Sequence, residues 1–299
     1  MDSKFIAFTK AAKLGSFKEA AEELGYTQAG VSYMISSLEK EMGVTLFHRG
    51  RTGAQLTEEG RTLLPWVLDI VNDESALEVK LREMRNLEIG DVRIASFASV
   101  AIHWLPDVFV RFMEDHPHIK LDVTCFEEQD EMEDAVQNGE FDCCFLIEPS
   151  VRDFYTIPLS LDPLFIVVPE DHPLAHKEFF PAEALAQEPY IKVRNDSHTE
   201  MDALFERHGV VPNVRFEMDN DYAVMGMVSR GLGYGVFPEL MLRDNPFKLV
   251  RLKPEIPTRR TIALAVKSYP KSSFATRAFI ESARSVVGEL NLAENMAQP

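Results

Sequence analysis

The sequence predicts an N-terminal all-α winged helix-turn-helix domain, a long linker helix and a two-lobed α/β domain. Two capped helical segments joined by a glycine-containing turn predict the first part. Apolar residues at alternating spacings of four and three predict the linker, and alternating strand and helix patterns predict the α/β domain. We place these parts at residues 1–60, 61–89 and 90–299.

The composition is that of a soluble chain with about two domains, since 45% of its 299 residues are hydrophobic. The N-terminus lacks the apolar core of a signal peptide, and no stretch approaches about 18 apolar residues, so we expect a cytoplasmic protein without membrane contact. Cys125, Cys143 and Cys144 form no C-x-x-C pair, which predicts reduced thiols. Redox sensing by the adjacent pair is the minor alternative, and we expect no metal or cofactor.

The negative charge is confined to one part of the chain. Residues 1–64 contain eight Lys and Arg and eight acidic residues, so the formal net charge of -17 arises wholly from residues 65–299. A general affinity for polyanions is therefore excluded. A neutral N-terminal domain that contacts nucleic acid at a few points remains possible.

Two short helices are predicted at the N-terminus. Ser16 and Glu19 have capping-box spacing, and Gly25 can end the first helix. Thr27 can cap the second helix, whose apolar side is one stripe made of Val31, Ile35, Leu38 and Met42. This arrangement is typical of a helix-turn-helix unit, in which the second helix enters the major groove.

The opposite face of the second helix is polar and uncharged, with Gln28, Ala29, Ser32, Tyr33 and Ser36. Glutamine can bind adenine through two hydrogen bonds, and serine can donate or accept, so Gln28 and Ser32 are candidates for reading bases. Tyr33 could contact a phosphate or a thymine methyl group. The alternative is a plain helical hairpin whose polar face meets only water.

A two-stranded wing is predicted after this helix. Residues 46–49 and 54–57 have strand patterns, and the turn between them contains two glycines. Arg49 and Arg51 lie near its tip, where they could neutralise phosphates. With Thr27 and the polar face of the second helix, they complete the predicted DNA-binding residues.

This region resembles the N-terminal domain of LysR-type transcriptional regulators. The matching residues are Phe8, Ser16, Phe17, Ala20, Ala21, Leu24, Thr27, Gln28, Val31, Ser32, Ile35, Leu38, Glu39, Leu46, Phe47, Arg49, Leu56, Thr57 and Gly60. The resemblance implies that Gln28 and Ser32 face DNA and that the wing arginine, Arg49, lies near the DNA backbone. Three positions depart from the family pattern: Ala29 replaces a frequent Pro, and Tyr33 and Ser36 replace frequent basic residues.

The linker helix is predicted from Glu58 to about residue 87. Its apolar residues are Leu63, Val67, Ile70, Leu77, Leu81 and Met84, with Glu74 interrupting the series. This pattern predicts a coiled coil, and hence a homodimer or a homotetramer built as a dimer of dimers. The alternative is a helix packed on its own domain. Pro65 should kink the helix or lie in its first turns, and a hinge is expected at residues 87–91.

The last two-thirds of the chain alternates strands and helices. The first set has strands near 92–95, 120–123 and 141–145 and helices near 102–113 and 132–137; a second set covers 164–237, and a strand near 261–266 returns to the first. We expect mostly parallel strands. Lobe 1 is predicted at about 90–161 and 266–299, and lobe 2 at about 162–265.

This part resembles the effector-binding domain of the same family, which has the fold of type 2 periplasmic binding proteins. The supporting residues are Leu105, Pro106, Phe112, His116, Pro117, Gly139 to Asp142, Pro169, His172 to Leu174 and Gly231 to Pro238. The resemblance implies a small-molecule effector, of unknown identity, in a cleft between the lobes.

Polar residues at predicted helix starts are candidates for effector binding, because ligands of open α/β folds sit at such positions. They are Ser96, Phe97, Ser99, Gln129, Ser197 and Asn220. Ser99 lies where family members commonly carry a Ser or Thr that contacts the effector. Each polar residue in this set could instead be only a helix cap.

An acidic run at residues 127–134 has two interpretations. Acids at a helix start favour its dipole, and the others can face solvent. Alternatively, one or two of these acids line the cleft and select a neutral or cationic effector over the carboxylates that many relatives bind.

The sequence thus predicts a ligand-responsive transcriptional regulator that binds double-stranded promoter DNA. The alternative is a solute-binding protein of the same α/β fold, although a helix-turn-helix would have no purpose there. An enzyme is the third possibility, and we assign no catalytic residue because the chain lacks a nucleophile elbow, a P-loop and a G-x-G-x-x-G turn.

Overall fold

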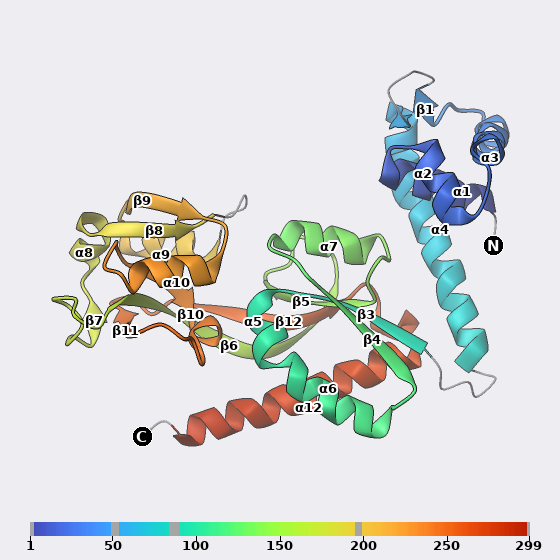
Figure 1. Cartoon of the computed structure of the whole chain (residues 1–299). Coiled ribbons are helices and arrows are strands. Elements are labelled where there is room, and N and C mark those ends of the chain that lie inside the picture. The colour runs from blue at the N-terminus through green and yellow to red at the C-terminus, as the bar shows by residue number, and fades with distance from the viewer. Residues whose placement is uncertain (1–2, 49–53, 84–89, 195–198, 298–299) are drawn as a thin grey trace. The chain divides into compact units, whose positions relative to one another are not determined.

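The computed structural model describes residues 3–48, 54–83, 90–194 and 199–297. The chain forms two compact units, of which the first contains the N-terminal region to Leu87 and the second contains most of the chain from Glu88 onward. Figure 1 shows both units and labels their elements. Among the described residues, no helix is long and apolar enough to cross a membrane.

The first unit is helical apart from a short wing. Its elements are α1 (Ser3–Leu14), α2 (Phe17–Leu24), α3 (Gln28–Met42), β1 (Phe47–His48), β2 (Gln55–Leu56) and α4 (Glu58–Glu83). The two strands pair antiparallel, as predicted for the wing. Helix α1 was not predicted, and it supplies Phe8, whose ring meets that of Phe47 edge to face at 5.6 Å.

The predicted helix ends of the first unit are confirmed. The Ser16 hydroxyl accepts a hydrogen bond from the Glu19 amide at 3.2 Å, and Thr27 accepts one from the Gly30 amide at 3.1 Å. Gly25 ends α2 with a φ of 70°, a conformation that favours glycine. The apolar stripe of α3 is buried at Val31, Ile35 and Leu38, so the polar face of α3 must point away from this core.

Helix α4 continues through Pro65, and its apolar residues serve two purposes. Val67 is buried in the core of the first unit, and Leu63 packs against the same core. In contrast, Ile70, Leu77 and Leu81 are exposed, as is Trp66, with 70% of its surface accessible. Packing on its own domain therefore accounts for the first half of α4 and leaves the second half of the stripe unexplained.

The second unit contains both lobes. Its strands are β3 (Gly90–Ser96), β4 (Ile119–Cys125), β5 (Cys143–Glu148), β6 (Tyr155–Pro169), β7 (Phe179–Phe180), β8 (Pro189–Val193), β9 (Asn213–Met218), β10 (Gly235–Pro238), β11 (Leu249–Pro254) and β12 (Arg259–Val266). Its helices are α5 (Ala98–His103), α6 (Leu105–Asp115), α7 (Gln129–Gln137), α8 (Ala182–Gln187), α9 (Glu200–His208), α10 (Asp221–Val228), α11 (Glu239–Leu242), the 3-10 helix η1 (Tyr269–Lys271) and α12 (Phe274–Ala297).

Two long strands connect the lobes. One sheet runs in the order β4-β3-β5-β12-β6-β11-β7, with β10 also paired to β6, and Figure 1 shows β6 and β12 running from one lobe to the other. The expectation of mostly parallel strands is wrong. Strand β3 is parallel to β4 and β5, but β6 is antiparallel to β10, β11 and β12. The chain crosses to the second lobe along β6 and returns along β12, so these two strands run in opposite directions.

The core of lobe 1 lies between its sheet and two helices. The 24-residue helix α12, which was not predicted, contributes Phe279, and its ring meets that of Phe112 from α6 at 5.9 Å. Cys143 and Cys144 are buried on strand β5, where burial raises the pKa of both thiols and keeps them protonated. Nothing in this environment favours redox chemistry at the pair.

The acidic run contains one fully buried carboxylate. Glu133 on α7 accepts hydrogen bonds from two side chains, the amide of Gln129 and the hydroxyl of Ser150, each at 2.8 Å. It also accepts from the backbone amides of Val151 and Arg152, at 3.1 and 3.2 Å. The interpretation that these acids meet only the helix dipole or solvent is therefore wrong for Glu133. This carboxylate fixes the loop after β5 to α7.

We expect Glu133→Ala to destabilise the second unit by about 1–3 kcal/mol, because the donors that converge on this buried carboxylate each lose an acceptor. The measurement is urea unfolding followed by fluorescence of Trp104, which is buried in this unit, in a Trp66→Phe background. Glu131→Ala, an exposed carboxylate on the same helix, is the matched control. Equal unfolding midpoints for the two variants would contradict the assigned role.

Candidate nucleic-acid interface and effector site

Helix α3 presents its predicted recognition face to solvent. Gln28, Ala29 and Ser32 are exposed, Tyr33 has 76% of its surface accessible, and Ser36 is half-buried. Thr27 holds the first turn of the helix in place through its cap. Gln28 and Ser32 lie one turn apart near this N-terminus, which is the geometry needed to reach neighbouring base edges in a major groove.

The wing is anchored to α3 by Glu39, a role the sequence pattern did not reveal. One carboxylate oxygen of Glu39 accepts hydrogen bonds from the amides of Leu46 and Phe47 at 2.8 and 3.3 Å. Thr57 joins the two ends of the wing, since its hydroxyl donates to the Thr45 carbonyl at 2.6 Å. The start of the wing is therefore hydrogen-bonded both to α3 and to the residue that precedes α4.

Gly60 explains part of the close fit between the wing and α4. A Cβ atom at this position would lie 2.2 Å from the carbonyl oxygen of Leu46, so only glycine lets the helix approach the backbone so closely. This is a physical reason for glycine at one of the family-matching positions.

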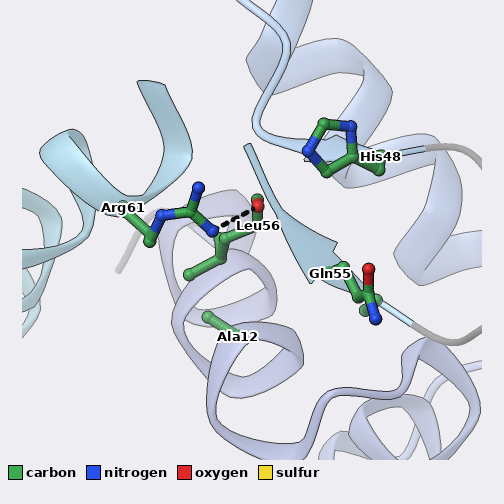
Figure 2. Close-up of a pocket in the computed structure, with 6 residues that line it drawn as sticks. Ala12, His48, Gln55, Leu56 and Arg61 are labelled. Carbon is green, nitrogen blue, oxygen red and sulfur yellow. Dashed lines mark hydrogen bonds between the residues drawn. The ribbon is translucent and has the colours of Figure 1, made fainter. Parts of the chain in front are cut away.

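A shallow pocket of about 360 Å³ lies beside the wing (Figure 2). It is lined by Ala12, His48, Ala54, Gln55, Leu56 and Arg61. Arg61 is exposed, and its guanidinium donates to the Leu56 carbonyl at 2.9 Å. A histidine of wing strand β1, His48, and an arginine of α4, Arg61, both line this pocket. The predicted wing cations Arg49 and Arg51 lie outside the described residues.

Two lysines of the first unit are paired with acids. Lys4 lies 2.5 Å from Glu41, and Lys10 lies 2.6 Å from Glu23. These exposed pairs add little stability. However, they offset positive charge that a phosphate would otherwise meet, which agrees with the neutral composition of this region.

In the second unit, Ser99 belongs to a buried polar cluster between the lobes. Its hydroxyl, in the first turn of α5, accepts a hydrogen bond from the Arg260 guanidinium at 3.2 Å. Arg260, on β12, also donates to Asp162 of β6 and to Glu200 at the start of α9, each at 2.9 Å. The ring of Phe97 lies 5.2 Å from the guanidinium carbon. Sequence reasoning missed Arg260, Asp162 and Glu200.

The carboxylates of this cluster keep Arg260 charged. Burial by itself would lower the pKa of the Arg260 guanidinium, but Asp162 and Glu200 raise the pKa on balance. Asp221, in the first turn of α10, lies in the field of the same groups. Burial raises its pKa, Arg260 opposes this, and Glu200 and Glu127 add to it. The first turns of α5, α9 and α10 therefore lie in one electrostatic environment. Helix starts that face a ligand site in an open α/β fold have this arrangement.

The other predicted effector residues have structural contacts. Gln129 donates to the Ile147 carbonyl at 2.9 Å and accepts from the Ile147 amide at 2.8 Å, so it completes the end of a strand. Asn220 caps α10 by accepting from the Ala223 amide at 3.0 Å, as the cap alternative anticipated. Ser96 is buried and donates to the Phe97 carbonyl at 3.2 Å. Ser197 lies outside the described residues.

No group of three or more His, Cys, Asp and Glu side chains that could hold a metal ion occurs in the described part of the chain. The described polar site between the lobes is built from one guanidinium, a hydroxyl and carboxylates.

We expect Glu39→Gln to loosen the wing, because a neutral amide accepts more weakly from the two wing amides. Hydrogen exchange at Leu46 and Phe47 should accelerate about tenfold, which corresponds to about 1.4 kcal/mol of lost local stability. Glu59→Gln, an exposed carboxylate of the same unit, is the control. Unchanged exchange at both amides would show that Glu39 does not anchor the wing.

Two family models match the chain. The model described as "Bacterial regulatory helix-turn-helix protein, lysR family" matches residues 3–61, and the model "LysR substrate binding domain" matches residues 85–288. The chain is also 29% identical to the RuBisCO operon transcriptional regulator of Allochromatium vinosum, over 88% of this chain and 84% of that protein.

Solved structures share the fold along the chain. A full-length OxyR variant from Pseudomonas aeruginosa matches with a TM-score of 0.76 and 19% identity, covering 96% of this chain and 94% of that one. The regulator CbnR, in a complex with its target DNA, matches with a TM-score of 0.63 and 18% identity, covering 96% and 99%. The chain belongs to the LysR family of transcriptional regulators, with a helix-turn-helix domain and a two-lobed substrate-binding domain.

Proposed function

We propose that this LysR-type regulator binds double-stranded promoter DNA through the N-terminus of α3 and the wing. The exposed row formed by Gln28, Ser32 and Tyr33 on a capped helix is the observation that carries this proposal. The Thr27 cap, Ala29 and Ser36 complete the face of α3, and Arg49 and Arg51 supply charge at the wing. CbnR, which has the same fold, was solved with its target DNA, and this supports the proposal.

Self-association follows from the exposed apolar stripe on α4. Ile70 is exposed near the middle of the helix, and Leu77 and Leu81 are exposed beyond the last residue that packs on the core of its own unit. A second α4 would cover them in a coiled coil. We propose a homodimer and, from pairs of dimers, a homotetramer, in which paired DNA-binding units contact adjacent half-sites and multiply weak single contacts.

The effector site is proposed between the lobes, at the cluster around Ser99 and Arg260. This cluster joins α5, β6, β12 and α9, so a small molecule bound there would contact elements of both lobes. The match to a family model for substrate binding supports the assignment. Ser96 and Phe97 adjoin the cluster on the chain, whereas Gln129 and Asn220 are better explained as structural residues, and Ser197 remains a candidate.

A solute-binding protein without DNA binding is not favoured, because residues 3–61 match a bacterial regulatory helix-turn-helix model. The family consists of regulators rather than enzymes, and we propose that this member has no catalytic activity. Its place of action is proposed to be the cytoplasm, where promoter DNA is available.

Retardation of DNA from upstream of its own gene, at low salt, tests the proposed function. The intact oligomer should retard this DNA, and Gln28→Ala should weaken specific binding by about 1–3 kcal/mol if Gln28 reads a base. Gln187→Ala, an exposed glutamine of the second unit, is the matched control. Absence of any retardation by the wild-type protein would refute DNA binding.

The salt dependence of binding should be shallow for a DNA-binding protein. The logarithm of the binding constant falls with the logarithm of salt concentration, with a slope of about -0.9 per neutralised phosphate. The recognition face has no cation, and Lys4 and Lys10 are paired with acids, so few phosphates should be neutralised. A slope near that of about ten phosphate contacts would reveal a basic surface outside these residues.

A further inference from the structure

Among the described residues, the Arg260 guanidinium is the basic group of the polar cluster between the lobes, and each of its three nitrogens already donates to a protein group. Only 7% of its side chain is accessible. Nε donates to Asp162, one terminal nitrogen donates to Glu200, and the other donates to Ser99. The ring of Phe97 covers the guanidinium from one side. An incoming carboxylate would therefore compete with protein groups that already accept from each nitrogen.

Asp162 and Glu200 have different roles at this guanidinium. Asp162 lies on β6 directly opposite Arg260 on β12, and its second oxygen accepts from the Leu240 amide at the start of α11 at 2.9 Å. It therefore belongs to the framework of the sheet. Glu200 comes from the first residue of α9, and its side chain is more accessible, at 15% against 5% for Asp162. The contact with Arg260 ties its carboxylate to β12.

The charges around the cluster disfavour an anion even beyond this contact. Two carboxylates, Asp162 and Glu200, act on the guanidinium itself. Asp221 lies in the same electrostatic environment, since Arg260 and Glu200 both act on it and Glu127 adds to the rise of its pKa. Asp162 alone would suffice to compensate Arg260 as a buried pair. Glu200 is therefore an additional carboxylate, held where a ligand carboxylate would otherwise form a charge-assisted hydrogen bond to the arginine.

We propose that Glu200 determines the charge class of the effector: it acts as an internal carboxylate on Arg260, so that the site rejects carboxylate ligands and accepts neutral or cationic ones. This inference rests on the proposed position of the effector site. Loss of Glu200 should convert the site into one that binds carboxylates. The terminal nitrogen of Arg260 that donates to Glu200 then lacks a carboxylate partner, and Asp162 still holds the guanidinium in place.

The test uses the full-length chain and sodium benzoate as the probe, with sodium chloride at equal ionic strength as the reference. Binding is measured by calorimetry and by the rise in melting temperature that a ligand of the native state produces. Glu200→Gln should bind benzoate with a Kd at least about tenfold below that of the wild-type protein. Glu200→Ala is measured in parallel, so that a folding defect of one variant does not decide the result.

Two further variants locate the effect. Glu206→Gln removes a carboxylate from the same helix, six residues further along, and should bind benzoate no better than the wild-type protein. The double variant Glu200→Gln with Arg260→Lys keeps the positive charge beside Asp162 but loses the planar fork of donors. It should lose the gain in benzoate affinity.

Equal benzoate affinity of the wild-type protein and the Glu200 variants would overturn the proposal, as would a gain that persists in the double variant. DNA retardation by the wild-type protein is scored separately. Its absence would refute the proposed function without changing the benzoate result, whereas equal benzoate affinities would refute charge selection by Glu200 and leave DNA binding untouched.

Discussion

The buried ion pair between Asp162 and Arg260 lies on β6 and β12, the two strands that connect the lobes. These residues face each other across the antiparallel β6-β12 pair, where the chain passes from one lobe to the other. Two charges out of water are costly unless both are well hydrogen-bonded. Here each charge has further hydrogen bonds: Asp162 accepts from the start of α11, and Arg260 also donates to Glu200 and Ser99.

The same pair makes the region between the lobes a place where ligand binding and lobe arrangement can be coupled. Arg260 connects α5 of one lobe with α9 of the other through a single side chain. A ligand that changes either contact changes the relative stability of different lobe arrangements. Such a ligand alters the regulator only if it binds those arrangements with different affinity.

The DNA-binding unit follows a different physical logic. Its stability comes from an apolar core and from precise ends of its helices, and its net charge is zero over residues 1–64. A neutral unit held in a strongly acidic chain gains little from long-range attraction to DNA. On the proposed function, we therefore expect affinity to depend on specific contacts at the start of α3 and on the pairing of subunits.

The sequence by itself determined the local features: the caps at Ser16 and Thr27, the buried stripe of α3, the wing and the family. These depend on residues close together in the chain, so their spacing carries the information. Only the tertiary structure decided that β6 and β12 run antiparallel, that Gln129 serves a strand end, and that Arg260 meets Ser99 across 161 positions of the chain. No local pattern encodes such contacts, because the order and register of the strands determine which distant residues meet.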